Sequence, residues 1–553
     1  MPQAQAVHST ADSTCAPGRA RPRTTVLEAL ERAVAAGGDD DFLEFTGTRY
    51  TFREVDRLST RFAHALAALG VTQGQTVSTV LDNNLDQVVC WFAVNKLGAI
   101  WVPLNTAYRG EFLRHQLADS CAEVVVCESD YLPNVLGVLG GATEVRTILC
   151  RGDLPCVEPP VGVRVEPLEA HRGTDETPLP FTARPEDLAL LIYTSGTTGP
   201  SKGCMISHNY ICHQAAQTNL AIPPIDGDVL YTCLPLFHVS AIDTLVSALL
   251  AHLRIAIAPR FSVSTFWSEI EQSGATNARL MSAIFPLLAS APDDPAMRRC
   301  FGQIRAVSGS PITPEVRKIW SDRFGVPFLN NYAYGQTEGV RLSMSRIGDT
   351  DTPEDSVGRI DTEAFDVVVL DDDDNTLPDG EIGEIAFRPR LPHVMFDGYW
   401  RRPEDTTEAW RNLWMHTGDL GRVVGGFLYF VDRKKDYLRN RGENISSFEV
   451  ERAILRHPDI VEAAAHPAGN GIAEGTLKIT AVLADGSQCT EEALCRWAVD
   501  HLPHFAVPRY IEFRDRLPKT PTNKVQKFRL RDEGVTATTW DRELSTIEVR
   551  RRR

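Results

Sequence analysis

The sequence predicts a layered α/β protein in which a large N-terminal part precedes a small α+β part. At 553 residues the chain is too long for one ordinary hydrophobic core, so its length predicts a large unit and at least one smaller domain. Helical and strand patterns alternate from residue 25 to about residue 420, which favours α/β layers over a bundle or a sandwich. Near residues 432–436 the charged stretch DRKKD follows the strand-like GFLYFV, and this change predicts a hinge.

The first 150 residues justify the α/β prediction most clearly. In TFREVDRLSTRFAHALAALG (residues 51–70) the apolar side chains follow helical spacing, Thr51 is placed to cap the start and Gly70 to end the helix. The strand-like QTVSTVL follows, then the helical DQVVCWFAVNKLG and three β-rich runs, AIWVPLN, AEVVVCES and RTILC. This alternation predicts repeated strand–helix–strand crossovers.

Later segments predict a hairpin and then the small domain. VVVL and EIGEIAF flank DDDDNTLPDG, whose acidic and turn residues favour an exposed hairpin tip over a metal site. Beyond the hinge, Ser446 and Glu449 have capping-box spacing and LKITAVL alternates like a strand. An amphipathic helix is indicated by Leu494, Trp497, Ala498 and His501.

Composition narrows the function classes. Apolar (43%) and charged (24%) shares are near globular averages, so a disordered or fibrous protein is disfavoured. A net charge of -16 disfavours nucleic acid as a partner despite the arginine run at residues 550–553.

The longest apolar run is interrupted by His252 and Arg254, and the N-terminus lacks a signal-peptide core. The twelve cysteines lack metal-ligand spacing. We therefore expect a cytoplasmic protein without a membrane span, with reduced thiols.

The segment LALLIYTSGTTGPSKG predicts a phosphate-binding loop. A β-type run ends in small and hydroxyl-bearing residues, and glycines let the backbone approach an anion closely. The predicted phosphate ligands are Thr194, Ser195, Gly196, Thr197, Thr198, Gly199 and Lys202. The spacing does not fit the Walker loop of P-loop NTPases. A flexible linker is disfavoured because the loop continues an apolar strand.

The same segment resembles the phosphate loop of the adenylate-forming superfamily, which includes acyl-CoA synthetases, peptide-synthetase adenylation domains and luciferases. Further segments match that family in order: LPLFH (234–238), SGSP (308–311), NYAYGQTE (331–338), TGD (417–419), DRKKDYLRNRGENIS (432–446) and PKTPTNKVQK (518–527). The chain is most similar to bacterial acyl-CoA synthetases. The resemblance implies a large adenylate-forming domain of layered α/β subdomains and a small mobile α+β lid.

The resemblance also implies domain bounds. Residues 25–434 would form the AMP-binding domain, and residues 435–540 the C-terminal lid, with the hinge near Lys435. Residues 1–24 are expected to form a disordered tail and residues 541–553 a second tail.

Roles for matched residues are implied in the same way. Tyr334 would stack on adenine, Asp419 would bind the ribose hydroxyls with help from Arg433, Thr337 would bind the α-phosphate, and Glu338 would hold Mg²⁺. Ser308, Gly309, Ser310, Pro311 and Gly335 complete the implied nucleotide site. The implied catalytic residues are Lys524, Thr337, Glu338 and Lys202.

Lys524 is the residue expected to carry the first step, by bridging the substrate carboxylate and the α-phosphate. Composition supports this role independently. Only 9 of the 57 basic residues are lysines, and six of these nine lie in the matched segments. A chain biased towards arginine retains lysine where a compact ammonium is required; chance clustering is the alternative.

For the second step, the family's lid rotates and builds a path for the thiol. Arg441, Gly442 and Glu443 would line this path. The chain departs from the family pattern at Arg441, Ser308 and Asn523, where glycine is usual. The implied acyl pocket is formed by Phe237, His238, Val239, Ser240, Ala283, Ile284 and Phe285. His238 is interpreted as a gate, with a buried core histidine as the equal alternative.

These observations predict an ATP-dependent acyl-CoA ligase that uses ATP, Mg²⁺ and coenzyme A and forms an acyl-adenylate first. Two alternatives stay open: an adenylation enzyme that loads a carrier protein, and a nucleotide-binding sensor without turnover. A homodimer also stays open. The arginine-rich composition suggests a GC-rich bacterial source and secondary metabolism, without naming the acid.

Overall fold

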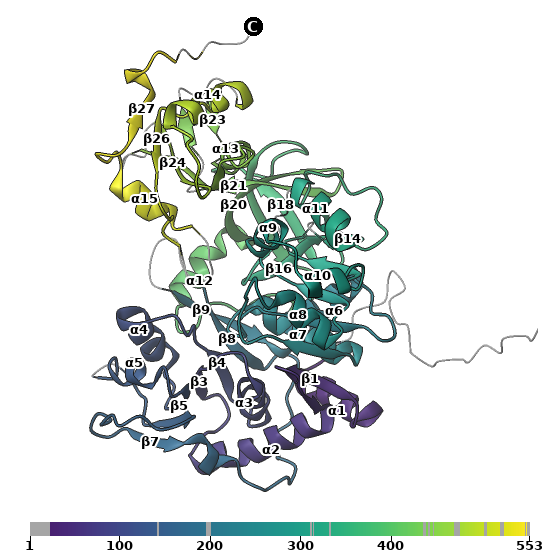
Figure 1. The fold of residues 1–553 in the computed structure, drawn as a ribbon. Helices are drawn as coiled ribbons and strands as arrows, with labels where there is room; N and C mark the ends of the chain where they lie inside the picture. The colour runs from purple at the N-terminus through teal and green to yellow at the C-terminus, as the bar shows by residue number, and fades with distance from the viewer. Residues whose placement is uncertain are drawn as a thin grey trace, which may run out of the picture.

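The computed structural model describes most of the chain and shows a layered α/β architecture. The described residues are 23–140, 143–194, 201–309, 312, 314–330, 333–434, 438–440, 443–445, 447–468, 476–502, 506–519, 525–547 and 549. Three seven-stranded sheets and their helices make up the large N-terminal part, and a four-stranded sheet with its helices forms a small C-terminal part. Figure 1 shows the C-terminal elements gathered at one end of the molecule. The predicted fold class is confirmed.

The first sheet has the order β7-β6-β5-β3-β4-β8-β9 and is parallel up to β8, with β9 added antiparallel. Its strands are β3 (Thr76–Val80), β4 (Ile100–Pro103), β5 (Val124–Glu128), β6 (Thr147–Arg151), β7 (Arg164–Pro167), β8 (Leu188–Thr194) and β9 (Lys202–Ser207). Its connecting helices are α3 (Leu85–Lys96), α4 (Gly110–Ser120) and α5 (Leu132–Leu136). The crossovers predicted for this region are confirmed.

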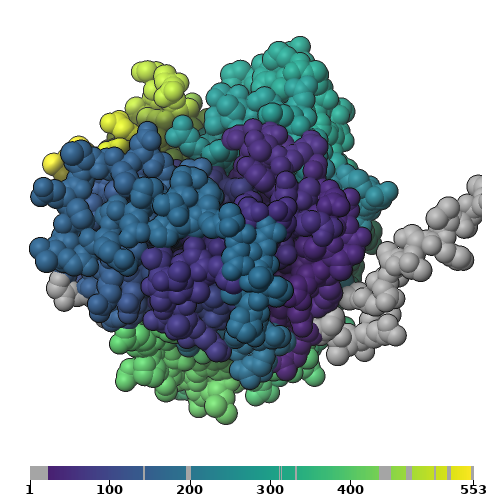
Figure 2. Space-filling view, turned by 90° about the horizontal axis from the view of Figure 1, so that it is seen from below, coloured from purple at the N-terminus to yellow at the C-terminus, as the bar shows by residue number. Residues whose placement is uncertain are grey.

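The second sheet, ordered β14-β13-β12-β10-β11-β1-β2, is parallel except for the β1–β2 hairpin. Its strands are β1 (Asp41–Phe45), β2 (Thr48–Thr51), β10 (Val229–Thr232), β11 (Arg254–Ile257), β12 (Asn277–Arg279), β13 (Ala306–Ser308) and β14 (Phe328–Asn330). The helices of this region are α1 (Val26–Gly37), α2 (Phe52–Ala68), α6 (His208–Ala221), α7 (Val239–Ala251), α8 (Phe266–Ser273), α9 (Ile284–Ser290), α10 (Pro295–Arg299) and α11 (Pro314–Phe324). Seen from below, the purple N-terminal segment packs against the blue segments (Figure 2).

The third sheet is antiparallel throughout, which the alternating pattern of the sequence did not predict. It has the order β15-β16-β17-β21-β20-β19-β18. The strands are β15 (Ala333–Gln336), β16 (Gly339–Met344), β17 (Arg359–Ile360), β18 (Phe365–Leu370), β19 (Gly383–Pro389), β20 (Met415–Val424) and β21 (Phe427–Arg433). Helix α12 (Pro403–Ala409) and the short 3-10 helix η2 (Arg411–Leu413) lie between β19 and β20.

The small domain has a four-stranded sheet, ordered β24-β25-β26-β27, and its own apolar core. Its elements are the hairpin β22 (Leu438–Asn440) and β23 (Glu443–Ile445), α13 (Ser447–Ile454), β24 (Ile460–Pro467), β25 (Leu477–Leu483), α14 (Glu491–His501), β26 (Tyr510–Phe513), α15 (Lys527–Glu533) and β27 (Trp540–Asp541). The 3-10 helix η4 (Arg542–Leu544) follows, and Ile547 and Val549 pack against the core. Ordered structure therefore extends beyond residue 540, where the sequence predicted a tail.

Several local predictions are confirmed by hydrogen bonds. Thr51 accepts from the backbone N–H of Glu54, whose carboxylate accepts from Thr51 N, so both halves of a capping box start α2. The acidic segment after β18 forms the tip of an antiparallel hairpin with β19. Ser446, the predicted cap of α13, lies outside the described residues, as does most of the predicted N-terminal tail; Arg23 and Thr24 already contact the folded part.

The eleven cysteines that the structure describes are all free, and most of them are buried. Within the same part of the chain, each helix is too short or too polar to span a bilayer.

Candidate active site

The predicted phosphate loop connects two paired strands. Thr194 ends β8 and Lys202 begins β9, and the two residues are antiparallel partners. Residues 195–200, predicted as Ser195, Gly196, Thr197, Thr198 and Gly199 with Pro200, lie outside the described part. Helix α4 holds the base of the loop: His115 Nε2 lies 2.8 Å from the carbonyl oxygen of Ser201, and Gln116 Nε2 donates to Ser201 Oγ at 3.0 Å.

Lys202 is held by two residues that the sequence analysis did not single out. Its Nζ donates to Asp405 Oδ1 at 2.6 Å and lies 5.0 Å from the ring centroid of Tyr399. Asp405 is on α12, and Tyr399 precedes that helix. A half-buried ammonium with one carboxylate and an aromatic face is well placed to exchange the carboxylate for a phosphate oxygen.

Tyr399 also contacts Glu338, the predicted Mg²⁺ ligand. The tyrosine hydroxyl donates to Glu338 Oε1 at 2.9 Å, and both side chains are about nine-tenths buried. Burial raises the pKa of Glu338, and the hydrogen bond from Tyr399 opposes the shift. The backbone beside Tyr399 is fixed along β9, since Met205 N donates to Gly398 O and Trp400 N to Gly203 O. Tyr399 thus lies between Lys202 and Glu338.

The YGQTE segment forms a tight β-hairpin. Gln336 ends β15 and pairs with Gly339, so Thr337 and Glu338 are the two residues of the turn. The hydroxyl of Tyr210 donates to the carbonyl oxygen of Thr337 at 2.9 Å, which fixes the turn from α6. At Gly335, a Cβ would lie 2.5 Å from the backbone nitrogen of Arg341. Glycine is therefore required at position 335 by the close approach of the two strands.

A second group of predicted residues meets where β15, β20 and β21 lie side by side. The Tyr334 hydroxyl donates to Asp419 Oδ2 at 2.7 Å, and Arg433 Nε lies 3.8 Å from Asp419 Oδ1. Asp419 and Arg433 are paired across β20 and β21. The structure therefore brings together three residues that are up to 99 positions apart in the chain, as their shared role requires.

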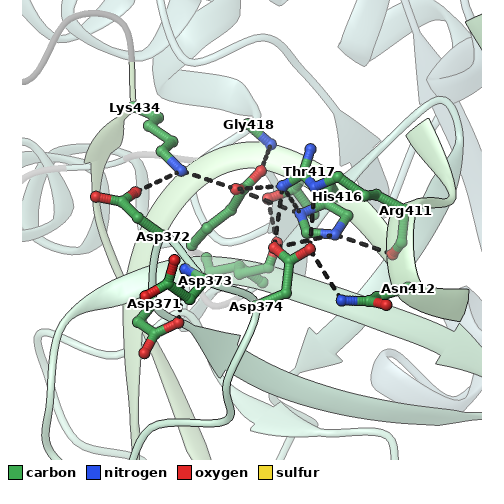
Figure 3. A network of polar contacts seen from close by, with 12 residues as sticks. Asp371, Asp372, Asp373, Asp374, Arg411, Asn412, His416, Thr417, Gly418 and Lys434 are labelled. Carbon is green, nitrogen blue, oxygen red and sulfur yellow. Dashed lines mark hydrogen bonds and ion pairs between the residues drawn. The ribbon is translucent and has the colours of Figure 1, made fainter. Parts of the chain in front are cut away.

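The segment around TGD is fastened by the ionic network in Figure 3. Glu384 accepts from two of the labelled residues: Gly418 N donates to Glu384 Oε1 at 3.1 Å, and Lys434 Nζ donates to Glu384 Oε2 at 3.2 Å. Lys434 also lies 3.1 Å from Asp372, in the acidic hairpin tip. Arg411 donates to both carboxylate oxygens of Asp374 in the same tip. The acidic tip therefore forms an ion pair with Lys434, the last described residue before Lys435.

SGSP lies at the end of β13 in the second sheet. Ser308 pairs with Asn330, and a Cβ on Gly309 would lie 2.4 Å from the ring of Phe285. Ser310 and Pro311 lie outside the described residues.

The seven predicted acyl-pocket residues divide into two groups. Phe237, His238, Ser240 and Ala283 are half-buried. Val239, Ile284 and Phe285 are buried, and Phe285 packs on Trp320 with ring centroids 5.0 Å apart. His238 precedes α7, and its ring lies 5.7 Å from that of Phe237.

Most of the predicted lid residues lie outside the described part: Lys435, Arg441, Gly442 and Lys524. The chain around them is defined. Asn440, the last residue of β22, pairs with Glu443, the first residue of β23. Lys519 and Val525, the described residues on either side of the segment that contains Lys524, form an antiparallel β-bridge.

One group of potential metal ligands occurs among the described residues, in the small domain: His457, Asp459 and Cys489. The backbone N–H of Asp459 donates to His457 Nδ1 at 3.2 Å, so a neutral ring carries its proton on Nε2. Nε2 is the nitrogen that lies 3.9 Å from Cys489 Sγ. In this arrangement the imidazole offers no lone pair to a metal beside the thiol.

Family models match both parts of the chain. The model described as AMP-binding enzyme matches residues 30–400, and the AMP-binding enzyme C-terminal domain matches residues 449–524.

Among curated proteins, a long-chain-fatty-acid–CoA ligase of Escherichia coli is 30% identical over 538 residues, covering 92% of this chain and 94% of its own length. A crotonobetaine/carnitine–CoA ligase of Citrobacter koseri is 29% identical, covering 87% of this chain and 93% of its own length.

Two solved structures have the same fold. The anthranilate CoA ligase AuaEII in complex with anthranoyl-AMP superposes with a TM-score of 0.81 at 24% identity, covering 93% of this chain and 98% of the other. O-succinylbenzoate coenzyme A synthetase of Bacillus subtilis, in complex with ATP and magnesium ion, gives a TM-score of 0.77 at 24% identity, with coverages of 91% and 99%.

Proposed function

The chain belongs to the AMP-binding enzyme family, and from that premise we propose how its residues divide the work of an acid–CoA ligase. The enzyme is an ATP-dependent, AMP-forming acyl-CoA ligase. In the first step a substrate carboxylate oxygen attacks the α-phosphorus of ATP, an acyl–O–P bond forms and pyrophosphate leaves. In the second step the CoA thiol attacks the acyl carbon, a C–S bond forms, AMP leaves and the thiol proton is released.

In the first step, Lys202 and the loop at residues 194–199 bind the phosphates, and Thr337 binds the α-phosphate. Lys202 exchanges Asp405 for a phosphate oxygen, since its only carboxylate partner in the described structure is 2.6 Å away on a separate helix. Lys524 completes the site from the small domain and stabilises the negative charge that builds at the α-phosphate.

The adenosine is bound by the group at β15, β20 and β21. Asp419 accepts hydrogen bonds from the ribose hydroxyls, and Arg433 keeps that carboxylate oriented from the neighbouring strand. Tyr334 presents its ring to adenine and keeps its hydroxyl on Asp419, so one side chain contacts base and ribose acceptor together.

Mg²⁺ fits the oxygen donor of Glu338. The carboxylate is held by Tyr399 in a largely buried position, and a hard oxygen ligand there suits Mg²⁺ better than a soft metal. When bound, the ion neutralises phosphate charge. Glu338 would hold the ion, and the hydrogen bond from Tyr399 opposes the effect of burial, which raises the pKa of this carboxyl group.

For the second step, we infer rotation of residues 435–540 about Lys435 so that Arg441, Gly442 and Glu443 line the path of the thiol. The described chain supports this division, because the network of Glu384 and Lys434 fixes the large domain up to residue 434. The two domains also have separate apolar cores.

The observation that supports these roles most strongly is the meeting of distant motif residues: Lys202 and Glu338 on the two sides of Tyr399, and Tyr334 with Asp419. Exchange of labelled pyrophosphate into ATP, dependent on a carboxylic acid, tests the first step. Formation of acyl-CoA from free CoA tests the second. Exclusive transfer to a carrier protein would favour the carrier-loading alternative, and absence of pyrophosphate exchange with every acid would favour the sensor.

The division between lid and large domain has its own test. Lys524→Ala should lower acid-dependent pyrophosphate exchange by about 10²-fold or more, because one transition-state donor is lost. Transfer from preformed acyl-adenylate to CoA should persist. Lys519→Ala is the matched control, since Lys519 pairs with Glu462 inside the small domain. Equal loss of both half-reactions in Lys524→Ala would contradict the proposed division.

The homodimer and the cytoplasmic location stay predictions. Light scattering of the purified protein tests the first, and fractionation of the source cells tests the second.

A further inference from the structure

Three charged side chains meet in the interior of the large domain, on the elements that carry the proposed acyl pocket. Asp243 is on α7, four residues after Val239, so the two side chains share a face of the helix. Arg279 ends β12, four residues before Ala283. Arg341 is on β16, three residues after Glu338.

Both guanidinium groups bind the same carboxylate oxygen. Arg279 Nη1 lies 2.6 Å and Arg341 Nη2 lies 3.2 Å from Asp243 Oδ2. Thr218 Oγ1 donates to both carboxylate oxygens at 2.9 Å. The side chain of Asp243 is 0% exposed, that of Arg341 6% and that of Arg279 12%. The two arginines thus form the accessible edge of a buried cluster.

The cluster contains two positive charges and one negative charge. Within the described ranges, no second carboxylate lies within 4.0 Å of either guanidinium. Asp361 is linked to the cluster indirectly, through Gln217. The Gln217 amide donates to the Asp361 carboxylate and to the backbone carbonyl oxygen of Arg341. Arg341 Nε is buried and has no hydrogen-bond acceptor. Among the described residues within 4.0 Å of one another, the cluster therefore has one positive charge in excess.

The backbone at Arg341 gives independent support. Its φ is +56°, in the left-handed region that side-chain-bearing residues adopt at a cost of about 1–3 kcal/mol. Strand β16 continues through this residue, so the conformation aims the arginine rather than ending the strand. A strained residue whose buried guanidinium keeps an N–H without an acceptor is typical of a ligand-binding position.

We propose that the excess guanidinium charge receives a second anionic group on the acid that this enzyme activates, so that its preferred substrates are dicarboxylates or other acids with a negatively charged far end. A pocket built for an uncharged chain would bury this charge at a cost of several kcal/mol with nothing to offset it. A guanidinium donates hydrogen bonds to a carboxylate, so the buried Nε–H of Arg341, which has no acceptor among the described residues, suits that group. The inference rests on the proposed acyl pocket.

The first experiment compares matched acids on the wild-type enzyme. Hexanoate is compared with hexanedioate, dodecanoate with dodecanedioate, and benzoate with benzene-1,3-dicarboxylate, by pyrophosphate release. We expect kcat/KM to favour the dianionic member of at least one pair by about 10-fold or more, since the unpaired charge is satisfied only by that member. Equal or better turnover of the uncharged-end member in all three pairs would overturn the proposal.

Variants of the cluster are expected to change the preference for the dianionic acid in opposite directions. Arg341→Met should reduce the preference for the dianionic acid by about 10-fold, and Arg341→Lys should retain part of the preference. Asp243→Asn should increase the preference, because it removes the competing carboxylate. A purely structural cluster would change stability in all three variants and the preference in none. Arg305→Met is the matched control, because Arg305 directly precedes β13 of the second sheet and its guanidinium donates to both carboxylate oxygens of Asp228.

Binding without turnover separates this proposal from the proposed function. The thermal unfolding midpoint of the wild type should rise with hexanedioate, dodecanedioate or benzene-1,3-dicarboxylate in the absence of ATP, and the rise should vanish in Arg341→Met. This result would support the anion site even if no acid released pyrophosphate. Equal midpoint shifts in the wild type and in folded Arg341→Met, with circular dichroism as the check of folding, would overturn it.

Discussion

Each of the two domains contains a cluster of charged side chains, and the two clusters differ in the balance of positive and negative charges. In the small domain Lys478 uses its three donors on Glu512, the carbonyl oxygen of Gly534 and Thr539. Glu512 also pairs with Arg514, which pairs with Glu533. Two cations thus face two anions. In the large domain Arg279 and Arg341 share Asp243 alone among the described carboxylates.

This difference separates a structural cluster from a binding cluster. A buried charged group whose donors are all satisfied stabilises one packing arrangement. Removal of its partner leaves a buried charge in a low-dielectric interior without a counterion. A buried charge in excess raises the energy of the empty site, and a ligand of opposite sign removes that cost. We therefore expect mutations in the first cluster to change stability and mutations in the second to change ligand preference.

The largest effect on stability is expected for Lys478→Met. The substitution leaves Glu512 buried with only Arg514 as a cationic partner, and it should destabilise the small domain by about 3 kcal/mol or more. Hydrogen exchange of the amides in β25 and β26 measures the loss locally. The acid preference of pyrophosphate release should stay unchanged; a change there would break the distinction between the two clusters.

The next largest effect is expected in the pH dependence of the unfolding free energy that the same cluster contributes. Burial raises the pKa of Glu512, but the hydrogen bond and charge of Lys478 outweigh it and lower the pKa to about 2. A folded-state pKa below the ordinary value of 4.5 contributes stability that is complete above pH 4.5 and is lost as the pH falls towards 2. The difference in unfolding free energy between wild type and Glu512→Gln should therefore shrink between pH 6 and pH 3. A constant difference would show that Glu512 is not the titrating group.

A smaller stability effect is expected for Arg341→Met. The substitution removes the charge in excess and leaves Asp243 paired with Arg279 and Thr218, so the free energy of unfolding should change by about 1 kcal/mol or less. Chemical denaturation followed by tryptophan fluorescence measures it. A loss as large as that of Lys478→Met would mean that the two clusters are equivalent.

The smallest effect is expected for an exposed pair, which sets the baseline for both clusters. Lys318 and Asp322 lie four residues apart on α11 with side chains 77% and 61% exposed. Lys318→Ala should change the unfolding free energy by about 0.5 kcal/mol or less. A larger change would place the other measurements in doubt.

How far the sequence predicted this structure depends on the range of the interactions involved. The helix at Phe52–Ala68 and its capping box were predicted because cap, period and end lie within twenty residues. Of the antiparallel sheet from Ala333 to Arg433, only the β18–β19 hairpin was predicted, because its two strands are joined by a recognisable turn. The other pairings join short strands with weak periodicity whose partners are distant in the chain.

The candidate site shows the same limit. The matched segments pointed to Lys202, Glu338, Tyr334 and Asp419, but no local signal connected Tyr399 or Asp405 to them. Tyr399 was detectable only as an aromatic residue in a loop, and its contacts with Lys202 and Glu338 come from segments 197 and 61 residues away.

By itself the sequence determined the fold class, the order of the motifs and the family, because these depend on local periodicity and on short segments whose chemistry is set by residue type and spacing. Only the tertiary structure decided which charges lie together and which are left unpaired. The reason is physical: the energy of a charge depends on the distance to its partners and on the removal of water, and both are set by packing between elements far apart in the chain.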